Sequence, residues 1–422
     1  MTCSDAPQAT HLAAQQAASQ TARASYGRLL AYLAYRWRDI AAAEDALAEA
    51  FASALQSWPA NGVPDAPDAW LMTAAKRNLL QMARHAKVAA DPAITILLGE
   101  TEQAAPVAPL IPDDRLKLLF VCAHPAIDPA VRTALMLQTV LGLDARRVAS
   151  AFLVSPTAMA QRLVRAKNKI AQQGIRFEEP EAKDLPDRIH AVLEAIYAAY
   201  SLGRDGAGSD DLGGLATSDM VNEALYLADL TASLLPQSAE AKGLLALLLL
   251  CEARRNARQG SQGQFVPLHQ QDCTAWDKTM VVQADRLLGQ AVALLQPGPF
   301  QLEAAIQAAH SERLFTQIVP WSSIAQLYDQ LVQLAPTTGA QVGRAVAIGE
   351  ARGAQHGLDA LSQVAGNSVQ NYQPFWVAQA YLLAKQAKSV DAQASYQQAL
   401  GLTTQPAVRA HLQSQIQVLL IK

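Results

Sequence analysis

The sequence predicts an all-α protein. Apolar residues recur three and four positions apart along much of the chain, which is the spacing of amphipathic helices. Asp128-Pro129 and Ser155-Pro156 each place a capping side chain before a proline that suits the first helical position. Small and large apolar residues also recur near the end of the chain, as they do in stacked helical hairpins. A chain of 422 residues has room for roughly two to four such helical domains.

Composition argues against a membrane or secreted protein. Hydrophobic residues make up 51% of the chain, which is ample for a buried core. The longest apolar run, GLLALLLLC from Gly243 to Cys251, is shorter than the roughly 18 residues of a membrane span. The first residues lack the basic and then apolar regions of a signal peptide. We therefore expect a cytoplasmic protein that does not contact a membrane.

The cysteines do not indicate a metal site or a disulfide framework. Cys3, Cys122, Cys251 and Cys273 stand far apart and form no C-x-x-C pair. Cys122 has His124 close by, but two candidate ligands do not make a site. The sequence predicts neither a metal nor a cofactor.

Charge is distributed unevenly along the chain. Residues 1–177 hold 18 Lys and Arg against 14 Asp and Glu, a net charge of +4, and the rest of the chain carries −7. A basic front portion and an acidic rear portion weakly indicate that the front binds nucleic acid.

A stretch from Ala42 to Lys87 contains two predicted helices joined by a loop with three prolines and a glycine. The first helix is acidic at its start. The second is expected to begin at Asp68 as its N-cap and to end in basic residues. The first has an apolar face made of Leu47, Ala50, Phe51, Ala54 and Leu55, and the second buries Trp70, Leu71, Ala74 and Leu79. This arrangement indicates an interaction surface rather than a catalytic pocket.

A short helix, a turn and a longer basic helix follow later in the chain. Asp144 is a predicted cap for the short helix, and Ser155 is a predicted cap for the longer one, which extends to about Ile170. Seven basic residues and no acid lie between Asp144 and Glu178. The outline is that of a helix-turn-helix, although a solvated helix with ordinary basic residues has the same composition.

The residues of the longer helix divide into three predicted groups. Thr157, Gln161, Arg162 and Arg165 face outward from the first turns, where a recognition helix reaches base edges. Lys167 and Lys169 lie further along and are expected to contact phosphates. Ala158, Leu163, Val164 and Ala166 are left to pack inward.

The stretch from Ala42 to Lys87 resembles region 2 of an RNA polymerase sigma factor of the extracytoplasmic-function class. The polymerase-docking segment of that region is matched by Glu44, Asp45, Phe51 and Trp58. Its −10-reading helix is matched by Trp70, Leu71, Lys76, Arg77 and Asn78. Many relatives have Asp where this chain has Gln81. The basic helix resembles the −35-reading region of the same class, and the two regions occur in the expected order.

The resemblance implies roles for particular residues. Glu44, Asp45 and Glu49 would dock on the clamp helices of core RNA polymerase. The −10 promoter element would be opened and read by Trp70, Lys76, Arg77, Asn78 and Arg84. The −35 element would be contacted by Arg147, Ser155, Thr157, Gln161, Arg162, Arg165, Lys167 and Lys169.

The rear of the chain resembles the C-terminal extension of a subgroup of these sigma factors. The match lies on an E-A-R-[RN] run, a Q-D-x-x-x-W-D segment and the P-G-P-[FY]-Q-L-x-A-A-I segment from Pro297 to Ile306. The tail also suggests tetratricopeptide-like hairpins, with a generic helical domain as the alternative. The positions that suggest one hairpin are Trp376, Ala380, Leu383, Ala392, Tyr396 and Ala399.

These observations give a predicted domain order. It comprises a flexible N-terminus at 1–20, sigma region 2 at 21–87, a linker at 88–112, a region 4 helix-turn-helix at 113–177, a helical extension at 178–295 and tetratricopeptide-like repeats at 296–422.

The predicted function is a sigma factor that binds core RNA polymerase and promoter DNA. Its extension is expected to regulate it through a regulatory protein or a ligand. An alternative is a helix-turn-helix regulator with a helical sensor domain and no polymerase role, and a weaker one is a scaffold built on the repeats. An enzyme is not expected, because no catalytic motif accompanies the polar residues His269, Asp272, Cys273, Asp277 and His310.

Overall fold

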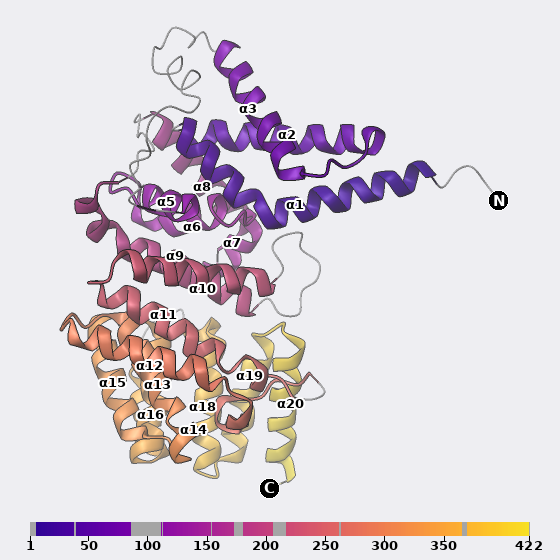
Figure 1. Ribbon diagram of the computed structural model, residues 1–422. Helices are drawn as coiled ribbons and strands as arrows, with labels where there is room; N and C mark the ends of the chain where they lie inside the picture. The colour runs from indigo at the N-terminus through magenta and orange to yellow at the C-terminus, as the bar shows by residue number, and fades with distance from the viewer. Residues whose placement is uncertain are drawn as a thin grey trace. The chain divides into compact units, whose positions relative to one another are not determined.

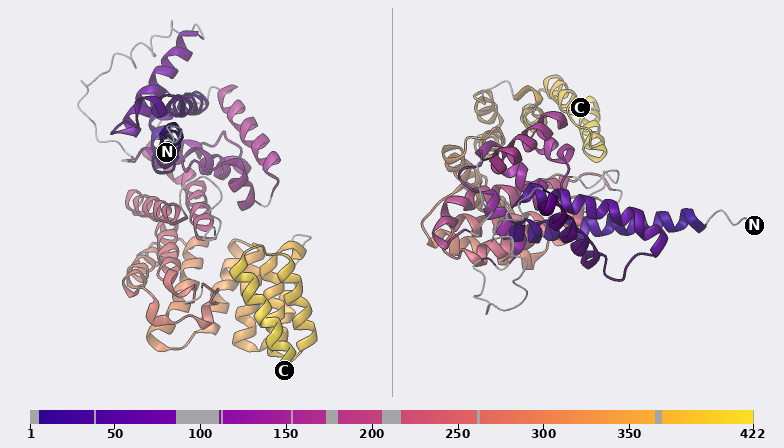
Figure 2. Two further views of the ribbon diagram at one scale, coloured as in Figure 1. Left: turned by 90° about the vertical axis from the view of Figure 1, so that its right-hand side faces the viewer. Right: turned by 90° about the horizontal axis from the view of Figure 1, so that it is seen from above.

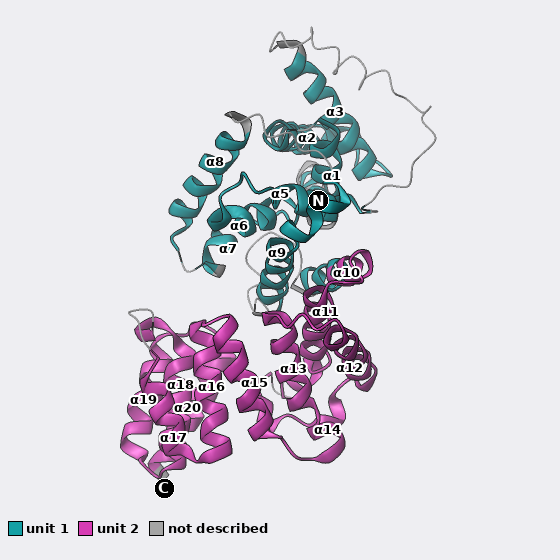
Figure 3. Ribbon diagram, turned by 90° about the vertical axis from the view of Figure 1, so that its left-hand side faces the viewer, with its two compact units in different colours: residues 1–227 teal, residues 228–422 magenta. Residues whose placement is uncertain are grey.

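The computed structural model describes residues 6–37, 39–85, 111, 113–152, 154–172, 180–205, 217–260, 263–364 and 369–421. Within these ranges all regular secondary structure is helical. The β pairing there is limited to an isolated bridge between Gln259 and Phe265. The predicted all-α fold is therefore confirmed. The chain forms two compact units, residues 1–227 and 228–422 (Figure 3). Among the described helices, none is both long and apolar enough to span a membrane.

Three helices open the first unit: α1 (Ala6–Trp37), α2 (Ile40–Asn61) and α3 (Pro67–His85), as Figure 1 shows. Helix α2 packs on both α1 and α3. Their shared core contains the fully buried residues Leu30, Leu33, Leu47, Leu71 and Leu79. Residues 6–20, expected to be frayed or loosely helical, form the first half of α1, on which Ala14 and Ala18 are buried.

Two local predictions in this region are wrong. Helix α2 continues through Pro59 to Asn61 and ends where Gly62 takes a positive φ of 83°. Asp68 lies in the first turn of α3 and is not its N-cap, because Pro67 occupies the first helical position and the carbonyl of Ala66 accepts from the N–H of Trp70.

Asp68 instead connects α3 to α1. Its Oδ2 accepts a hydrogen bond from the Ser25 hydroxyl at 2.7 Å and pairs with the Arg28 guanidinium at 2.6 Å. The side chain therefore joins the start of α3 to α1.

Four more helices follow: α5 (Asp114–Cys122), α6 (Pro129–Thr139), α7 (Ala145–Ala151) and α8 (Pro156–Gln172). The predicted caps are confirmed. Asp128 accepts from the N–H of Ala130, Asp144 from those of Arg146 and Arg147, and Ser155 from that of Ala158. Of the predicted linker at 88–112, only Ile111 lies within the described residues.

Helices of the predicted extension also belong to the first unit. Helix α9 (Leu185–Asp205) packs on α5 and α6, and a buried Arg188 donates from Nη1 to the carbonyl of Phe120 at 3.2 Å. Helix α10 (Thr217–Leu234) contributes Glu223, which forms an ion pair with Arg115. The boundary between the two compact units thus lies within α10, beyond the predicted domain boundary at 178.

The second unit is a succession of helices, most of which pack on helices next to them or one further along in the sequence (Figures 1 and 2). They are α11 (Ala239–Glu252), α12 (Lys278–Ala293), α13 (Pro299–Ser311), α14 (Arg313–Thr316), α15 (Trp321–Leu334), α16 (Thr338–Arg352), α17 (Ala354–Ser362), α18 (Gln373–Lys385), α19 (Ser389–Gly401) and α20 (Pro406–Ile421). Separate apolar clusters join α13 to α15 and α16, then α16 to α17 and α18, then α18 to α19 and α20. Each cluster is shared only by nearby helices, as in repeat proteins.

Helices α11 and α13 approach each other closely at Gly243. A Cβ atom at this position would lie 2.6 Å from the backbone nitrogen of Gln301 and 2.7 Å from its Cα. These are backbone atoms, so they cannot rotate away as a side chain could. Gly243 is therefore required for the packing of the two helices.

We expect Gly243→Ala to lower the free energy of unfolding of the second unit by about 1–3 kcal/mol through overpacking. Gly289→Ala is the matched control in the same unit, because nothing lies within 4 Å of its added Cβ. That control should raise the free energy of unfolding by about 0.5–1 kcal/mol through helix propensity. Urea unfolding monitored by circular dichroism measures both. Equal stabilisation by the two substitutions would contradict the close approach.

Candidate polymerase and nucleic-acid interfaces

The three acids predicted to bind polymerase lie on α2, but they differ in environment. Asp45 and Glu49 are exposed and stand one turn apart on the helix. Glu44 is half-buried, and its carboxylate accepts a hydrogen bond from the Nζ of Lys167 on α8. Burial raises the pKa of Glu44, and the positive charge of Lys167 opposes this effect. Only Asp45 and Glu49 are thus presented freely by this conformation.

The predicted −10-reading residues of α3 do not form one exposed surface. Arg77 is exposed, and the ammonium of Lys76 lies 5.0 Å from the centre of the Tyr32 ring. Trp70 packs edge-on against Trp58, with ring centroids 5.6 Å apart. The side chain of Arg84 lies outside the described residues.

Asn78 has a structural contact where a DNA contact is predicted. Its Nδ2 donates to the carbonyl of Ala46 at 3.1 Å, which ties α3 to α2. The sequence could not reveal this bond because the acceptor lies on a different helix.

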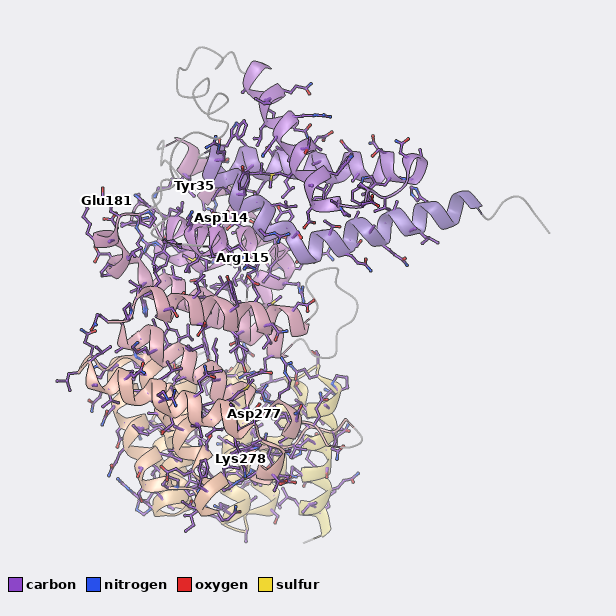
Figure 4. The ribbon with its side chains drawn as sticks, in the orientation of Figure 1. Tyr35, Asp114, Arg115, Glu181, Asp277 and Lys278 are labelled. Carbon is purple, nitrogen blue, oxygen red and sulfur yellow. The ribbon has the colours of Figure 1, made fainter. Side chains whose placement is uncertain are left out.

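Two exposed tyrosines on α1, one of them beside Lys76, are absent from the predicted site. Tyr32 and Tyr35 are both 37% exposed and stand three residues apart, so they share one helix face. The ammonium of Lys117 lies 4.9 Å from the Tyr35 ring centre, beside the start of α5 (Figure 4). The sequence did contain a signal for these residues. The two tyrosines stand at helical spacing, opposite the leucines of the buried face.

Helix α8 presents most of its predicted −35-reading residues to solvent. The exposed set is Ser155, Thr157, Gln161, Arg162, Arg165 and Lys169. Spacings of three and four place the last five of these on neighbouring positions of the helix surface. This exposed, basic face is what the predicted recognition helix requires.

Two other predicted −35-reading residues, Lys167 and Arg147, are not fully exposed to solvent. Lys167 is paired with Glu44, and its side chain is 17% exposed. Arg147 is half-buried, and within the described residues its Nη1 is buried without a hydrogen-bond partner.

The predicted inward face of α8 is partly wrong. Val164 is 56% exposed, whereas Met159, Leu163 and Ile170 are buried. The buried residues follow a spacing of four and seven that places Val164 off the packed side.

The polar residues that invited a catalytic interpretation stabilise the second unit. Asp272 and Asp277 accept hydrogen bonds from backbone N–H groups at the starts of a short 3₁₀ turn and of α12. His310 packs edge-on against Trp321 at 5.2 Å, and burial lowers its pKa to about 4. The Cys273 sulfur accepts from Nε of Arg313 at 3.0 Å.

His269 also has a structural environment, with its ring 6.1 Å from that of Tyr381 on α18. Burial lowers the pKa of His269. Nearby, the guanidinium groups of Arg254 and Arg313 lie 5.8 Å and 5.3 Å from the centre of the Trp276 ring. The contacts of these residues connect segments of the second unit.

Among the described residues, the candidate metal ligands are scattered. Across the described ranges, no three His, Cys, Asp or Glu residues are close enough together to hold an ion. The thiol of Cys122 is buried against the Thr139 hydroxyl at 3.7 Å, and His124 accepts from the N–H of Ala126. Burial raises the pKa of Cys122 to about 12, which disfavours the thiolate that a metal would require.

Comparisons with known proteins agree with this description of α1 to α3. Residues 23–88 match the family model for sigma-70 region 2, which covers the acidic start of α2 and all of α3. Residues 188–292 match a family of unknown function, DUF6596, which extends from α9 to α12. An uncharacterized protein of Rhizobium meliloti (strain 1021) is 33% identical over 396 residues, which cover 92% of each chain.

The region 2 match identifies the family of this chain. Region 2 is the part that gives a sigma-factor-like role in RNA polymerase binding. The chain belongs to the sigma-70 family and combines region 2 with a helical C-terminal extension.

Proposed function

We propose that this protein is a sigma factor of the extracytoplasmic-function class that directs transcription initiation at specific promoters. Asp45, Glu49 and, once released, Glu44 dock on core RNA polymerase. Helix α3 opens and reads the −10 element, and the α7–α8 pair reads the −35 element. The proposal rests on the region 2 match and on the helix-turn-helix outline of α7 and α8, which follows region 2 in the chain.

The α7–α8 pair supports a helix-turn-helix assignment. A seven-residue helix with an Asp144 cap precedes a seventeen-residue helix with a Ser155 cap. The exposed face of the longer helix carries Arg162 and Arg165, which can reach guanine edges in a major groove. An ordinary helix-turn-helix regulator would have this pair but has no use for a polymerase-binding region 2.

The extension is proposed to regulate this activity through a bound protein or ligand. Two features support regulation: the acidic excess of residues 178–422, and the packing of α9 on the helices that precede α7 and α8. The successive helices of the second unit, proposed to be tetratricopeptide-like, provide a surface for such a partner. The chain is proposed to act by binding and not by catalysis, since the polar residues of the second unit are engaged in structural contacts.

Co-purification of the full chain with core RNA polymerase is the first test. We expect a stable complex that starts transcription at promoters identified by sequencing the bound DNA. DNA binding without polymerase binding would contradict the proposal and favour the ordinary regulator.

Removal of a base contact should weaken promoter recognition. We expect Arg162→Ala and Arg165→Ala each to cost about 1–3 kcal/mol of specific binding, which is roughly 5- to 150-fold in promoter affinity. Arg286→Ala is the matched control, because this arginine is exposed on α12 in the other unit. Fluorescence anisotropy with promoter and scrambled duplexes separates specific from non-specific loss. Normal affinity of both α8 variants would refute the assignment of the recognition helix.

Truncation tests the regulatory role of the second unit. A chain ending at Pro236 keeps α9 and α10, whereas one ending at Phe177 loses α9 and uncovers the buried side of α6. We expect the 1–236 chain to remain folded and to differ from the full chain in promoter activity in cells, with loss of response to the inducing partner. Identical activity of these two chains would rule out regulation by the second unit.

A further inference from the structure

We propose that residues 263–271, which lie between α11 and α12, occupy a peptide-binding face of the second unit, and that an extended, proline-containing segment of a partner protein displaces them. These residues read GQFVPLHQQ and are called the strap. The inference rests on the proposed regulatory role of the extension. It names the place on the second unit where a partner binds and the kind of segment that the partner offers.

The C-terminal end of the strap is held by one arginine of α14. Arg313 donates from Nη1 to the carbonyl of His269 at 2.9 Å and from Nη2 to that of Gln271 at 2.6 Å. Within the strap, the side chain of Gln271 donates to the carbonyl of Val266 at 3.1 Å. All three bonds are accepted by backbone carbonyls, so they fix the path of the chain without using the rings of Phe265 and His269.

Two rings of the strap reach helices at the other end of the unit. The Phe265 ring lies 5.6 Å from the His411 ring on α20, and the His269 ring lies 6.1 Å from the Tyr381 ring on α18. Figure 1 shows this part of the chain beside α20. Helices α18, α19 and α20 have an apolar cluster of their own, formed by residues of these three helices. The strap therefore lies against them from outside and is not part of their core.

The helices that receive the strap present a polar and aromatic face. We call it the receiving face, and it consists of Glu350 of α16, Tyr381 and Lys385 of α18, and His411 of α20. The Tyr381 hydroxyl donates to Glu350 at 2.6 Å. The Lys385 ammonium pairs with the same carboxylate and lies 5.2 Å from the centre of the Tyr381 ring, so the ring is held in place. Burial and the nearby His269 lower the pKa of His411, so its imidazole is uncharged at neutral pH and can pack against an aromatic ring.

The strap buries little of its own surface. Phe265 is 37% exposed, and the other apolar side chains of the strap, Val266, Pro267 and Leu268, are only half-buried. A segment with so few buried apolar contacts opens at a lower free-energy cost than the packed helices beneath it. Because the strap is tethered, it still competes at an effective concentration in about the millimolar range. It therefore blocks the receiving face against weak ligands and yields to a tighter one.

The strap also shows what kind of segment the receiving face accepts. Pro267 (φ −61°, ψ 152°) and Gln271 (φ −65°, ψ 140°), on either side of a short 3₁₀ turn, have the backbone conformation of polyproline II. Phe265 and His269 place two rings four residues apart, with the proline between them. Proline-containing segments bind aromatic-lined surfaces at a low cost in entropy, because their backbone is already ordered. The partner segment is expected to carry two ring side chains at this spacing around a proline.

The test titrates the full chain into a fluorescently labelled peptide with the sequence GQFVPLHQQ and follows the anisotropy of the label. We expect Phe265→Ala in the protein to tighten the peptide affinity by about three- to tenfold, because the strap loses a ring contact and leaves the receiving face vacant more often. A peptide that carries the same Phe265→Ala change is the matched ligand control, and it should bind this protein more weakly.

Variants of the receiving face locate the bound peptide. In the Phe265→Ala protein, His411→Gln and Tyr381→Leu should each weaken peptide binding by about three- to tenfold, because each removes a ring that the peptide contacts. Val390→Ala is the matched control: this residue is 80% exposed on α19, outside the receiving face, and its loss should leave the affinity unchanged. Circular dichroism checks that each variant keeps its helices.

Three outcomes would overturn the proposal. The first is equal peptide affinity of the parent and Phe265→Ala proteins, and the second is unchanged affinity in both variants of the receiving face. The third is a dimer of the full chain, seen by light scattering, that the peptide dissociates, because the occupant would then be the strap of a second copy. The titration needs neither polymerase nor DNA. A chain that fails to bind polymerase would therefore refute the proposed function, and the peptide would still decide whether the receiving face is a binding site.

Discussion

Helix α5 buries every residue from Leu116 to Cys122, so it has no face for water and needs neighbours all around. Helix α1 covers one side, and α6 and α9 cover the others. Burial of one large apolar side chain contributes about 1.5–3 kcal/mol, so Leu116, Leu119 and Phe120 together contribute on the order of the net stability of a domain. Helices α1, α6 and α9 are held together in the first unit because all three pack on α5.

Charged groups near α5 show how the unit tolerates its few buried ions. Arg115 contacts Asp113 at 3.0 Å and also pairs with Glu223, while its guanidinium lies 5.1 Å from the Tyr226 ring centre (Figure 4). Burial alone would raise the pKa of Asp113, but the hydrogen bonds and charge of Arg115 hold it below its usual value. Paired ions of this kind avoid the desolvation penalty of a lone buried charge. By contrast, Arg162, Arg165 and Lys169 of α8 are exposed to water.

The sequence predicted features that depend on neighbours along the chain. The caps at Asp128, Asp144 and Ser155 follow from a side chain and the next turn of the same helix, and the structure has all three. Region 2 was recognisable for a similar reason, because its residue spacing lies within 66 matched positions.

Features that depend on distant segments were not predictable in this way. Asp68 bonds to Ser25 and Arg28, Asn78 bonds to Ala46, and Lys167 pairs with a glutamate 123 residues earlier. Val164 is exposed because the packed side of α8 is set by the helices around it and not by the apolar pattern alone. The membership of α9 in the first unit has the same origin, since its partners α5 and α6 precede it by more than 45 residues.

The successive apolar clusters of the second unit have a consequence for how the protein can vary in length. Because the cluster of α18, α19 and α20 does not include residues of α13 or α15, loss of the last helices leaves the earlier clusters intact. Opening of the chain should therefore proceed from the C-terminal end, with amide hydrogens of α20 exchanging before those of α16. An architecture of this kind lets evolution lengthen, shorten or change one end of the molecule while the residues of the first unit stay as they are.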